Sequence, residues 1–347
     1  MELQSSYPPP FRRPSGPAPA VDPDEGSRTT NQIQEQDPIP VVDLQRLDVE
    51  GERLGEACRA WGIFRVVNHG VPLDLLTRLR DRARRLFALP FESKQALLVA
   101  PLSYFWGTPV LTPSGSALLG GAQGVNWVEG LNVPLAQLSL LGDGGGGGGG
   151  GGDDDDEVVT AVASLRNLLQ EYGVHLARIA KLLFQAMAED LRLDPAHSKS
   201  YLSESTGFVR LYRYPHCSKA SSDMSGMEAH SDSSVLSILC QDEVGGLELY
   251  KDEQWIQVQP VPDALIVNVG DMLQAMSDDE YISVKHRVKV KKPQDRTSVC
   301  YFVFPGQDSV IRSSKYRPFT YGDFQSQVQQ DVKTLGFKVG LPRFKLD

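Results

Sequence analysis

A series of short β-prone runs in the second half of the chain constrains the fold more than any other feature. From residue 207 onward, apolar runs alternate with short segments rich in Gly, Pro and Asp. Many short strands at such spacing are typical of a sandwich or barrel, in which neighbouring strands bury one shared face. The runs occupy residues 208–214, 235–240, 247–250, 255–258, 265–269, 283–290 and 298–304.

The first half of the chain shows helical spacing instead, with apolar residues recurring every three or four positions. Helices are predicted at residues 50–61, 73–88, 158–191 and 324–335, and short strands at residues 39–44 and 63–67. The longest helix has a core face of Leu165, Leu168, Leu169, Leu176, Ile179, Leu182 and Leu183. The expected fold is mixed α/β, a double-stranded β-helix (jelly-roll) barrel with packed N-terminal helices.

Composition limits the classes of function. The chain has 347 residues, a 41% hydrophobic fraction and a formal net charge of −9. No basic face indicates nucleic acid, and no apolar run has the length of a membrane span. The four cysteines, too sparse for a disulfide framework, favour a reducing compartment and hence the cytoplasm. They are Cys58, Cys217, Cys240 and Cys300, and all but Cys217 lie in apolar patterns.

One insertion stands apart from this pattern. Nine consecutive glycines at residues 144–152 precede four aspartates at residues 153–156. Glycine loses the most entropy on ordering and the acids repel one another, so a flexible surface loop is predicted. A Ca²⁺-binding acidic loop is the alternative, but nothing pre-organises its carboxylates.

Two histidines and one aspartate form a candidate metal site. His230 and Asp232 are two residues apart, so in an extended segment both point to one face. Period-2 patterning turns His286 inward together with Val284 and Val288. Two imidazoles and one carboxylate leave three adjacent coordination positions open, which suits Fe(II) better than a closed zinc site. Taken alone, the H-x-D pair is better explained by a surface strand without function, and the third histidine and the residues after it reverse that balance.

A candidate anion site follows in the next apolar strand. Arg296 and Ser298 share one face, ten and twelve residues after His286. The planar fork of arginine is a natural bidentate partner for a carboxylate, and a serine hydroxyl supports it. The alternative for Arg296 is an exposed residue at the start of a strand.

Together these motifs resemble the Fe(II)/2-oxoglutarate-dependent dioxygenase superfamily. The order His230-x-Asp232, His286, Arg296-x-Ser298 carries the resemblance. Residues 39–44 and 61–71 look like the N-terminal module of its soluble plant branch. Residues 210–215 match the R-x-N-x-Y-P segment of that branch, with Tyr212 in place of the asparagine, which puts any polar contact from that position in doubt.

The resemblance implies a cofactor set and a reaction. Fe(II) would be bound by His230, Asp232 and His286, with 2-oxoglutarate as co-substrate and ascorbate as support. The tyrosine of the motif helps to hold 2-oxoglutarate in the family, so Tyr214 inherits this role beside Arg296 and Ser298. No catalytic residue is expected beyond the metal ligands. Oxidative decarboxylation to succinate and CO₂ would accompany hydroxylation or desaturation of a small molecule by O₂. The expected protein is a monomer that binds neither nucleic acid nor membrane.

Several stretches look most like gibberellin oxidases, of the 20-oxidase-like or 2-oxidase-like kind. They are residues 126–130, 240–247, 268–277 and 324–340. A gibberellin is an apolar polycycle with a carboxylate. Its carboxylate partner is left open among Arg65, Arg210 and Arg213, and four aromatic residues fit either a substrate pocket or ordinary core packing: Tyr104, Trp106, Trp127 and Phe304. His69 is expected to cap a turn, and residues 268–271 to form a strand and tight turn rather than a site.

Three other functions remain open. One is an oxidase of the same fold that uses no 2-oxoglutarate, resembling aminocyclopropane-carboxylate oxidase. Another is an oxygenase of flavonoids or other specialised metabolites, since substrate choice depends on loops. The third is a catalytically silent protein that binds a small molecule on this scaffold.

The expected organisation divides the chain into six segments. They are residues 1–37 (disordered tail), 38–135 (N-terminal module), 136–157 (flexible Gly/Asp loop), 158–204 (helical scaffold), 205–305 (Fe(II)/2-oxoglutarate catalytic jelly-roll) and 306–347 (C-terminal extension with a helix).

Overall fold

The computed structural model describes residues 37–96, 101–107, 126–140, 153–216, 225–290 and 294–346. Residues 1–36 of the predicted tail and the nine glycines of the predicted loop lie outside these ranges, as does Cys217. Among the described residues, no helix is long and apolar enough to cross a membrane.

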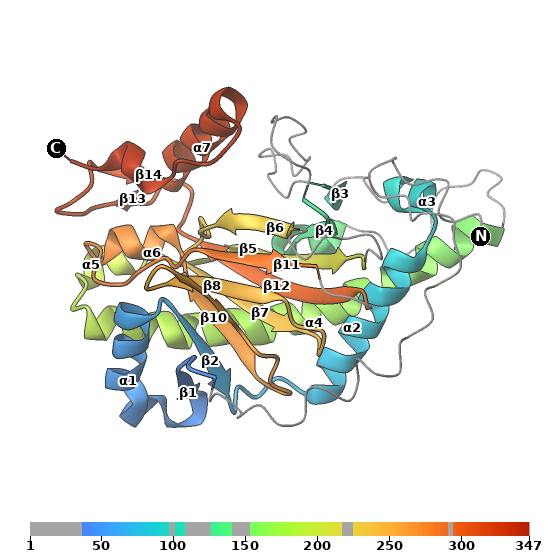
Figure 1. Ribbon diagram of the computed structural model, residues 1–347, viewed down its shortest axis with the longest axis horizontal. Coiled ribbons are helices and arrows are strands. Elements are labelled where there is room, and N and C mark those ends of the chain that lie inside the picture. The colour runs from blue at the N-terminus through green and yellow to red at the C-terminus, as the bar shows by residue number, and fades with distance from the viewer. Residues whose placement is uncertain are drawn as a thin grey trace.

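Two sheets form the core of the molecule (Figure 1). The large sheet has eight strands in the order β1-β2-β10-β7-β12-β5-β4-β3, and the small sheet has four in the order β6-β11-β8-β9. The strands of the large sheet are β1 Val41–Asp43, β2 Ile63–Val67, β3 Ser103–Trp106, β4 Glu129–Pro134, β5 Ser203–Tyr214, β7 Leu236–Gln241, β10 Leu265–Val269 and β12 Arg296–Phe304. Those of the small sheet are β6 Ser225–His230, β8 Leu247–Lys251, β9 Gln254–Gln257 and β11 His286–Lys289. The predicted double-stranded jelly-roll is confirmed.

Helices cover one side of the large sheet, where α4 crosses the strands between α1 and α2 (Figure 1). The helices are α1 Leu47–Ala60, α2 Leu73–Ala88, α3 Phe91–Ala96, α4 Asp153–Asp190, α5 Pro195–Ser198, α6 Asp271–Met276 and α7 Tyr321–Leu335. Shorter elements are the 3₁₀ turns Leu44–Arg46, Leu135–Leu140 and Leu341–Phe344 and the hairpin strands β13 Val310–Ile311 and β14 Phe319–Thr320. Because these helices cover one face of the large sheet, its other face is open to the small sheet.

Helix α4 departs from the prediction at two points. It begins at Asp153, so the aspartates of the predicted loop form its first turn. Leu182, predicted to lie in the core face, is 38% exposed, whereas its neighbour Leu183 is fully buried. Adjacent helical residues point about 100° apart, so both cannot face the sheet equally well.

Strand β12 determines what the inner face of the large sheet presents. Its alternate residues share one face, with Arg296 and Ser298 near one end and Phe302 further along. Ser237 stands opposite Phe302 on β7 and donates a hydrogen bond to Asp232, in the loop after β6. Arg296 and Ser298 are therefore on the face that is directed toward the small sheet.

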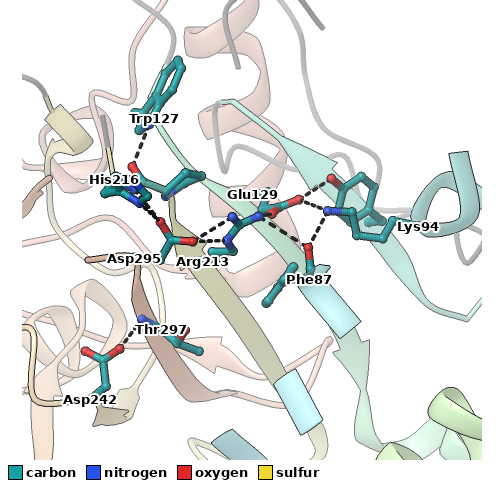
Figure 2. Close-up of polar contacts among 11 residues, drawn as sticks. Phe87, Lys94, Trp127, Glu129, Arg213, His216, Asp242, Asp295 and Thr297 are labelled. Carbon is teal, nitrogen blue, oxygen red and sulfur yellow. Dashed lines mark hydrogen bonds and ion pairs between the residues drawn. The ribbon is translucent and has the colours of Figure 1, made fainter. Parts of the chain in front are cut away.

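A buried ion network fastens α3 to the other face of the large sheet (Figure 2). The Glu129 carboxylate accepts hydrogen bonds from Lys94 Nζ at 2.8 Å, Arg213 Nη1 at 2.5 Å and Tyr104 OH at 2.5 Å. Arg213 also donates to Asp295 at 2.7 Å, directly before Arg296 in the chain. Burial lowers the pKa of Lys94, and the Glu129 carboxylate opposes that shift.

Replacing Lys94 by methionine is expected to lower the free energy of unfolding by about 3 kcal/mol, because the Glu129 carboxylate stays buried with one counter-charge fewer. Urea denaturation measures this loss. The matched control is Lys181→Met, at a residue whose side chain is 70% exposed, where a change within about 0.5 kcal/mol is expected. Equal losses in the two variants would contradict a stabilising role for the Lys94–Glu129 pair.

Candidate metal and co-substrate site

His230, Asp232 and His286 converge where the two sheets meet. His230 ends β6 and stands directly opposite His286, the first residue of β11. Their ring centroids are 4.4 Å apart. Each Nε2 atom lies 3.7 Å from Asp232 Oδ1, and the three potential ligand atoms all lie within 4.8 Å of one another. Three donors of the predicted types therefore meet at one point.

The local reason for this convergence differs from the prediction in one respect. The spacing of His230 and Asp232 predicts that both lie on one face of a single strand, but β6 ends at His230 and Asp232 lies in the following loop. Asp232 is held there by the backbone, since its carbonyl accepts a hydrogen bond from Asp271 N at 2.7 Å. Gly270 permits this approach, because a Cβ atom there would lie 2.0 Å from Ser234 O.

The hydrogen bonds of the two histidines and Asp232 leave one atom of each side chain available to a metal ion. His230 Nδ1 lies 2.8 Å from Glu228 O, and His286 Nδ1 lies 3.2 Å from Val284 O. A carbonyl can only accept, so each Nδ1 carries the proton and each Nε2 lone pair is left for a ligand bond. Asp232 Oδ2 accepts hydrogen bonds from Ser237 and, at 3.4 Å, from Asn268, which leaves Oδ1 toward the histidines.

The protonation states also suit metal binding. Burial and the neighbouring His286 lower the pKa of His230 to about 4, so its imidazole is neutral at neutral pH. Burial alone would raise the pKa of Asp232, but the two histidines, Ser237 and Lys338 together hold it below its usual value. A neutral imidazole and an ionised carboxylate are the forms that bind a divalent cation.

Lys338 ties the C-terminal segment to the loop between His230 and Asp232. Its Nζ donates to the Ser231 carbonyl at 2.8 Å and forms an ion pair with Asp271 Oδ2 at 2.5 Å. The side chain of Asp271 is 5% exposed, so this pair is largely shielded from water. The segment after α7 therefore supports the loop that carries Asp232.

Replacing Lys338 by methionine is expected to weaken Fe(II) binding about ten- to hundredfold, as is usual when the groups that orient metal ligands are lost. Anaerobic calorimetric titration with Fe(II) measures this effect. The matched control is Lys315→Met, since Lys315 is 48% exposed and pairs with Asp279 at 3.5 Å. An Fe(II) affinity equal to that of the control would show that Lys338 does not position the loop.

Arg296 is a buried cation on the inner face of β12. It is 2% exposed, so the alternative of an exposed strand-start residue is wrong. Its Nη1 donates to Ser298 Oγ at 3.0 Å and its Nη2 to Gln241 Oε1 at 3.1 Å, while its guanidinium lies 4.9 Å from the centre of the Tyr214 ring. In the described part of the chain Arg296 has no ion-pair partner, and its buried Nε has no acceptor. Such an arginine is suited to an anion brought from outside.

A nearby carboxylate is already used by the backbone. Asp242 accepts hydrogen bonds from the backbone N–H of Thr297 at 2.5 Å and of Val244 at 3.1 Å, the first of which Figure 2 shows. Burial raises the pKa of Asp242. Asp242 thus holds the start of β12 in place without forming an ion pair with Arg296.

Two of the three arginines considered for a substrate carboxylate are engaged elsewhere. Arg65 pairs with Asp37 at 2.5 Å and donates to Gln259 O at 2.6 Å. Arg213 belongs to the Glu129 network. Of the three, Arg210 alone forms no ion pair within the described residues.

Other residues singled out in the sequence have structural roles. His69 Nδ1 accepts a hydrogen bond from Val71 N at 3.1 Å, which confirms the predicted turn cap. Trp127 Nε1 donates to Pro215 O at 2.8 Å, and Phe304 packs on Phe208 and Tyr321. Cys58, Cys240 and Cys300 are buried free thiols, as predicted.

Sequence reasoning missed the residues that support this site, chiefly Ser237, Asn268, Gln241 and Lys338. Ser237 and Asn268 did carry a signal, because each is a polar residue inside an apolar strand run. A buried polar group needs a partner. The pattern of residues 268–271 predicts a strand and tight turn rather than a site, yet the Asn268 amide donates to the Asp232 carboxylate at 3.4 Å. Nothing in the local sequence around Lys338 predicts its role, since its partners Ser231 and Asp271 are more than sixty residues away in the chain.

Comparison with known protein families gives a concordant result. Residues 205–305 match the family model of the 2OG-Fe(II) oxygenase superfamily. Residues 39–138 match the model described as the N-terminal region of non-haem dioxygenase in morphine synthesis. The first match contains the histidines, Asp232 and Arg296.

Relatives and solved structures extend the similarity over most of the chain. The chain is 38% identical to gibberellin 2-beta-dioxygenase 6 of Oryza sativa subsp. japonica, over 88% of this chain and 84% of that protein. It is 36% identical to gibberellin 2-beta-dioxygenase 8 of Arabidopsis thaliana, over 90% and 88%. The crystal structure of JOX2 in complex with 2OG, Fe and JA aligns with a TM-score of 0.71 at 25% identity, over 95% of this chain and 99% of that one. The chain therefore belongs to the 2OG-Fe(II) oxygenase superfamily and is an oxidoreductase that depends on Fe(II) and 2-oxoglutarate.

Proposed function

We propose that this dioxygenase hydroxylates a gibberellin, with His230, Asp232 and His286 as iron ligands and Tyr214, Arg296 and Ser298 around 2-oxoglutarate. The observation that carries the substrate class is the 36–38% identity to two gibberellin 2-beta-dioxygenases over most of both lengths. Two observations carry the residue roles: the convergence of His230, Asp232 and His286, and the burial of Arg296, which forms no ion pair with any residue that the structure describes.

In this proposal the protein residues bind and orient the reactants. Arg296 and Ser298 hold the distal carboxylate of 2-oxoglutarate, and the Tyr214 ring packs against the Arg296 guanidinium. The backbone carbonyls at Glu228 and Val284 fix the proton of each imidazole on Nδ1. Bound Fe(II) supplies the centre at which 2-oxoglutarate and O₂ react to give succinate, CO₂ and an oxidised substrate.

We further propose that the protein acts as a monomer in the cytoplasm. One chain supplies all three metal-binding residues and the arginine, so the site is complete without a second copy. Three buried free thiols are compatible with a reducing compartment. Ascorbate is expected to support activity by keeping the iron reduced.

The test is anaerobic reconstitution with Fe(II) and 2-oxoglutarate, followed by exposure to O₂ and mass-spectrometric screening of gibberellins. A gibberellin that gains one oxygen atom, with stoichiometric succinate, is the expected result. Flavonoids are included in the screen because a flavonoid 7-O-demethylase of Ocimum basilicum is 30% identical over 79% of this chain. Succinate formed only with flavonoids would overturn the proposed substrate class. Failure to consume 2-oxoglutarate with any substrate would overturn the reaction and favour a binding protein.

A further inference from the structure

Arg210 is a second cation on the inner face of the large sheet. It lies on β5, directly opposite Cys300 on β12 and on the same face as Tyr212 and Tyr214. Burial and the Asp232 carboxylate raise the pKa of the Cys300 thiol, whereas Arg210 and Arg296 oppose the shift. The Phe302 ring, 5.3 Å from the Arg210 guanidinium, belongs to the residue opposite Ser237, which donates a hydrogen bond to Asp232. Arg210 therefore lies on the face of the sheet that carries the candidate metal site.

Aromatic rings surround the Arg210 guanidinium. Its central carbon lies 5.1 to 5.9 Å from the ring centres of Phe105, Phe208, Tyr212 and Phe302. Rings within about 6 Å stabilise a cation through their negative faces, but they cannot accept a bidentate pair of hydrogen bonds in the guanidinium plane. The rings fix the orientation of Arg210 and leave its in-plane donors to another group.

One edge of this guanidinium has no acceptor. Nη1 donates to Tyr212 OH at 3.0 Å. The buried Nε has no partner, and no ion pair reaches Arg210 anywhere in the described ranges. The Nε–Nη2 edge is the fork that binds a carboxylate with two parallel hydrogen bonds. A donor pair held in place without an acceptor points to a ligand.

Two neighbouring side chains add polar atoms to the same place. Tyr212 stands where the plant R-x-N-x-Y-P motif has asparagine, and burial raises its pKa to about 12, so the hydroxyl keeps its proton at neutral pH. After accepting from Arg210, this hydroxyl still has a hydrogen to donate. Asn132 lies opposite Arg210 on β4, and its buried Oδ1 also lacks a partner. An unpaired acceptor beside unpaired donors suits a ligand that carries both a carboxylate and a hydroxyl group.

We propose that Arg210, assisted by the Tyr212 hydroxyl, binds the carboxylate of the oxidised substrate, and that Phe105, Phe208 and Phe302 contact its apolar body. Arg296 is reserved for the carboxylate of 2-oxoglutarate, so the inner face holds two anions at two separate arginines. The substrate is therefore a free acid rather than an ester or a neutral metabolite. This inference rests on the proposed function only in taking the bound acid to be the oxygenase substrate.

The test compares acids with their methyl esters, which differ by the charge that Arg210 would bind. Three pairs are titrated calorimetrically into protein loaded anaerobically with Fe(II) and 2-oxoglutarate, where no turnover occurs: a gibberellin, jasmonic acid and indole-3-acetic acid. At least one acid is expected to bind about 30-fold or more tightly than its ester. In Arg210→Met the affinity for the acid should fall by about that factor, whereas the affinity for the methyl ester should change little. Arg210→Lys should retain part of the preference for acid over ester. Tyr212→Phe should lose less of that preference than Arg210→Met does.

Two controls separate this role from a structural one. The affinity for 2-oxoglutarate should stay unchanged in every Arg210 variant, which also shows that the barrel is intact. Arg53→Met replaces an arginine whose side chain is 57% exposed and should retain the full acid preference.

The outcomes also separate this inference from the proposed function. If gibberellin shows no preference but another acid shows one that depends on Arg210, the site stands and the gibberellin assignment fails. If gibberellin is bound and hydroxylated equally well by Arg210→Met, the assignment stands and the site is overturned. Absence of any acid preference in the unmodified protein, or a preference that survives in both Arg210 variants, overturns the inference as well.

Discussion

Alanine in place of His286 is expected to abolish iron binding and all turnover. Loss of the groups that only orient metal ligands commonly costs ten- to hundredfold in affinity, so loss of a ligand should cost more than about a hundredfold. His286 is 6% exposed and its Nε2 lies 3.7 Å from Asp232 Oδ1, so alanine there leaves only His230 and Asp232 of the three candidate ligands. Anaerobic Fe(II) titration and succinate release measure the two effects.

The matched control for that variant is His197→Ala. His197 lies on α5, and its side chain is 46% exposed beside Asp194. This variant should bind iron and release succinate at the rate of the unmodified protein. Full activity of His286→Ala at saturating Fe(II) would refute the assignment of the metal site.

Arg296→Gln is expected to raise the KM for 2-oxoglutarate about 30-fold or more. Removing one partner of a buried charge pair costs about 2–5 kcal/mol, and Arg296 is the buried cation available to the distal carboxylate. Arg296→Lys should recover part of the affinity, because lysine supplies the charge but not the planar fork. Consumption of 2-oxoglutarate without added substrate gives the KM even before the natural substrate is known.

Arg317→Gln serves as the control, since Arg317 is an exposed residue stacked on Phe344. Its KM for 2-oxoglutarate should equal that of the unmodified protein. An unchanged KM in Arg296→Gln would mean that 2-oxoglutarate is bound elsewhere, and Arg210 would be the next residue to examine.

These two predictions come from residues that the sequence already singled out. The periodicity of apolar residues located α2, β2 and β10 with the bounds that the structure has. Local pattern succeeds there because α2 buries one apolar stripe, whereas β2 and β10 are largely apolar runs that are buried on both faces. No strand is predicted for β3, β4 or most of β6, because their short, mixed sequences show no clear apolar period. Their strand conformation depends on pairing with distant segments, since β3 pairs with β4, β4 with β5, and β6 with β11.

The sequence predicts the chemistry of the candidate metal site because that chemistry requires particular residue types. Two histidines and an aspartate offer a coordination set that few other combinations provide. The sequence does not predict that Asp232 lies in a loop, because this position depends on hydrogen bonds from Ser237, Asn268 and Asp271. Those partners come from β7, β10 and α6, and only folding brings them to one place.

The sequence by itself determined the class of fold, the three side chains of the candidate metal site and the arginine that follows them. The tertiary structure decided which arginines are free to bind an anion. Arg65, Arg210 and Arg213 are alike as residues in a sequence, since each carries the same charge on the same side chain. Arg65 and Arg213 meet carboxylates from distant segments, whereas Arg210 meets aromatic rings and a hydroxyl. Whether a buried charge is neutralised is a property of its neighbours in space, and those neighbours are set by the packing of the sheets.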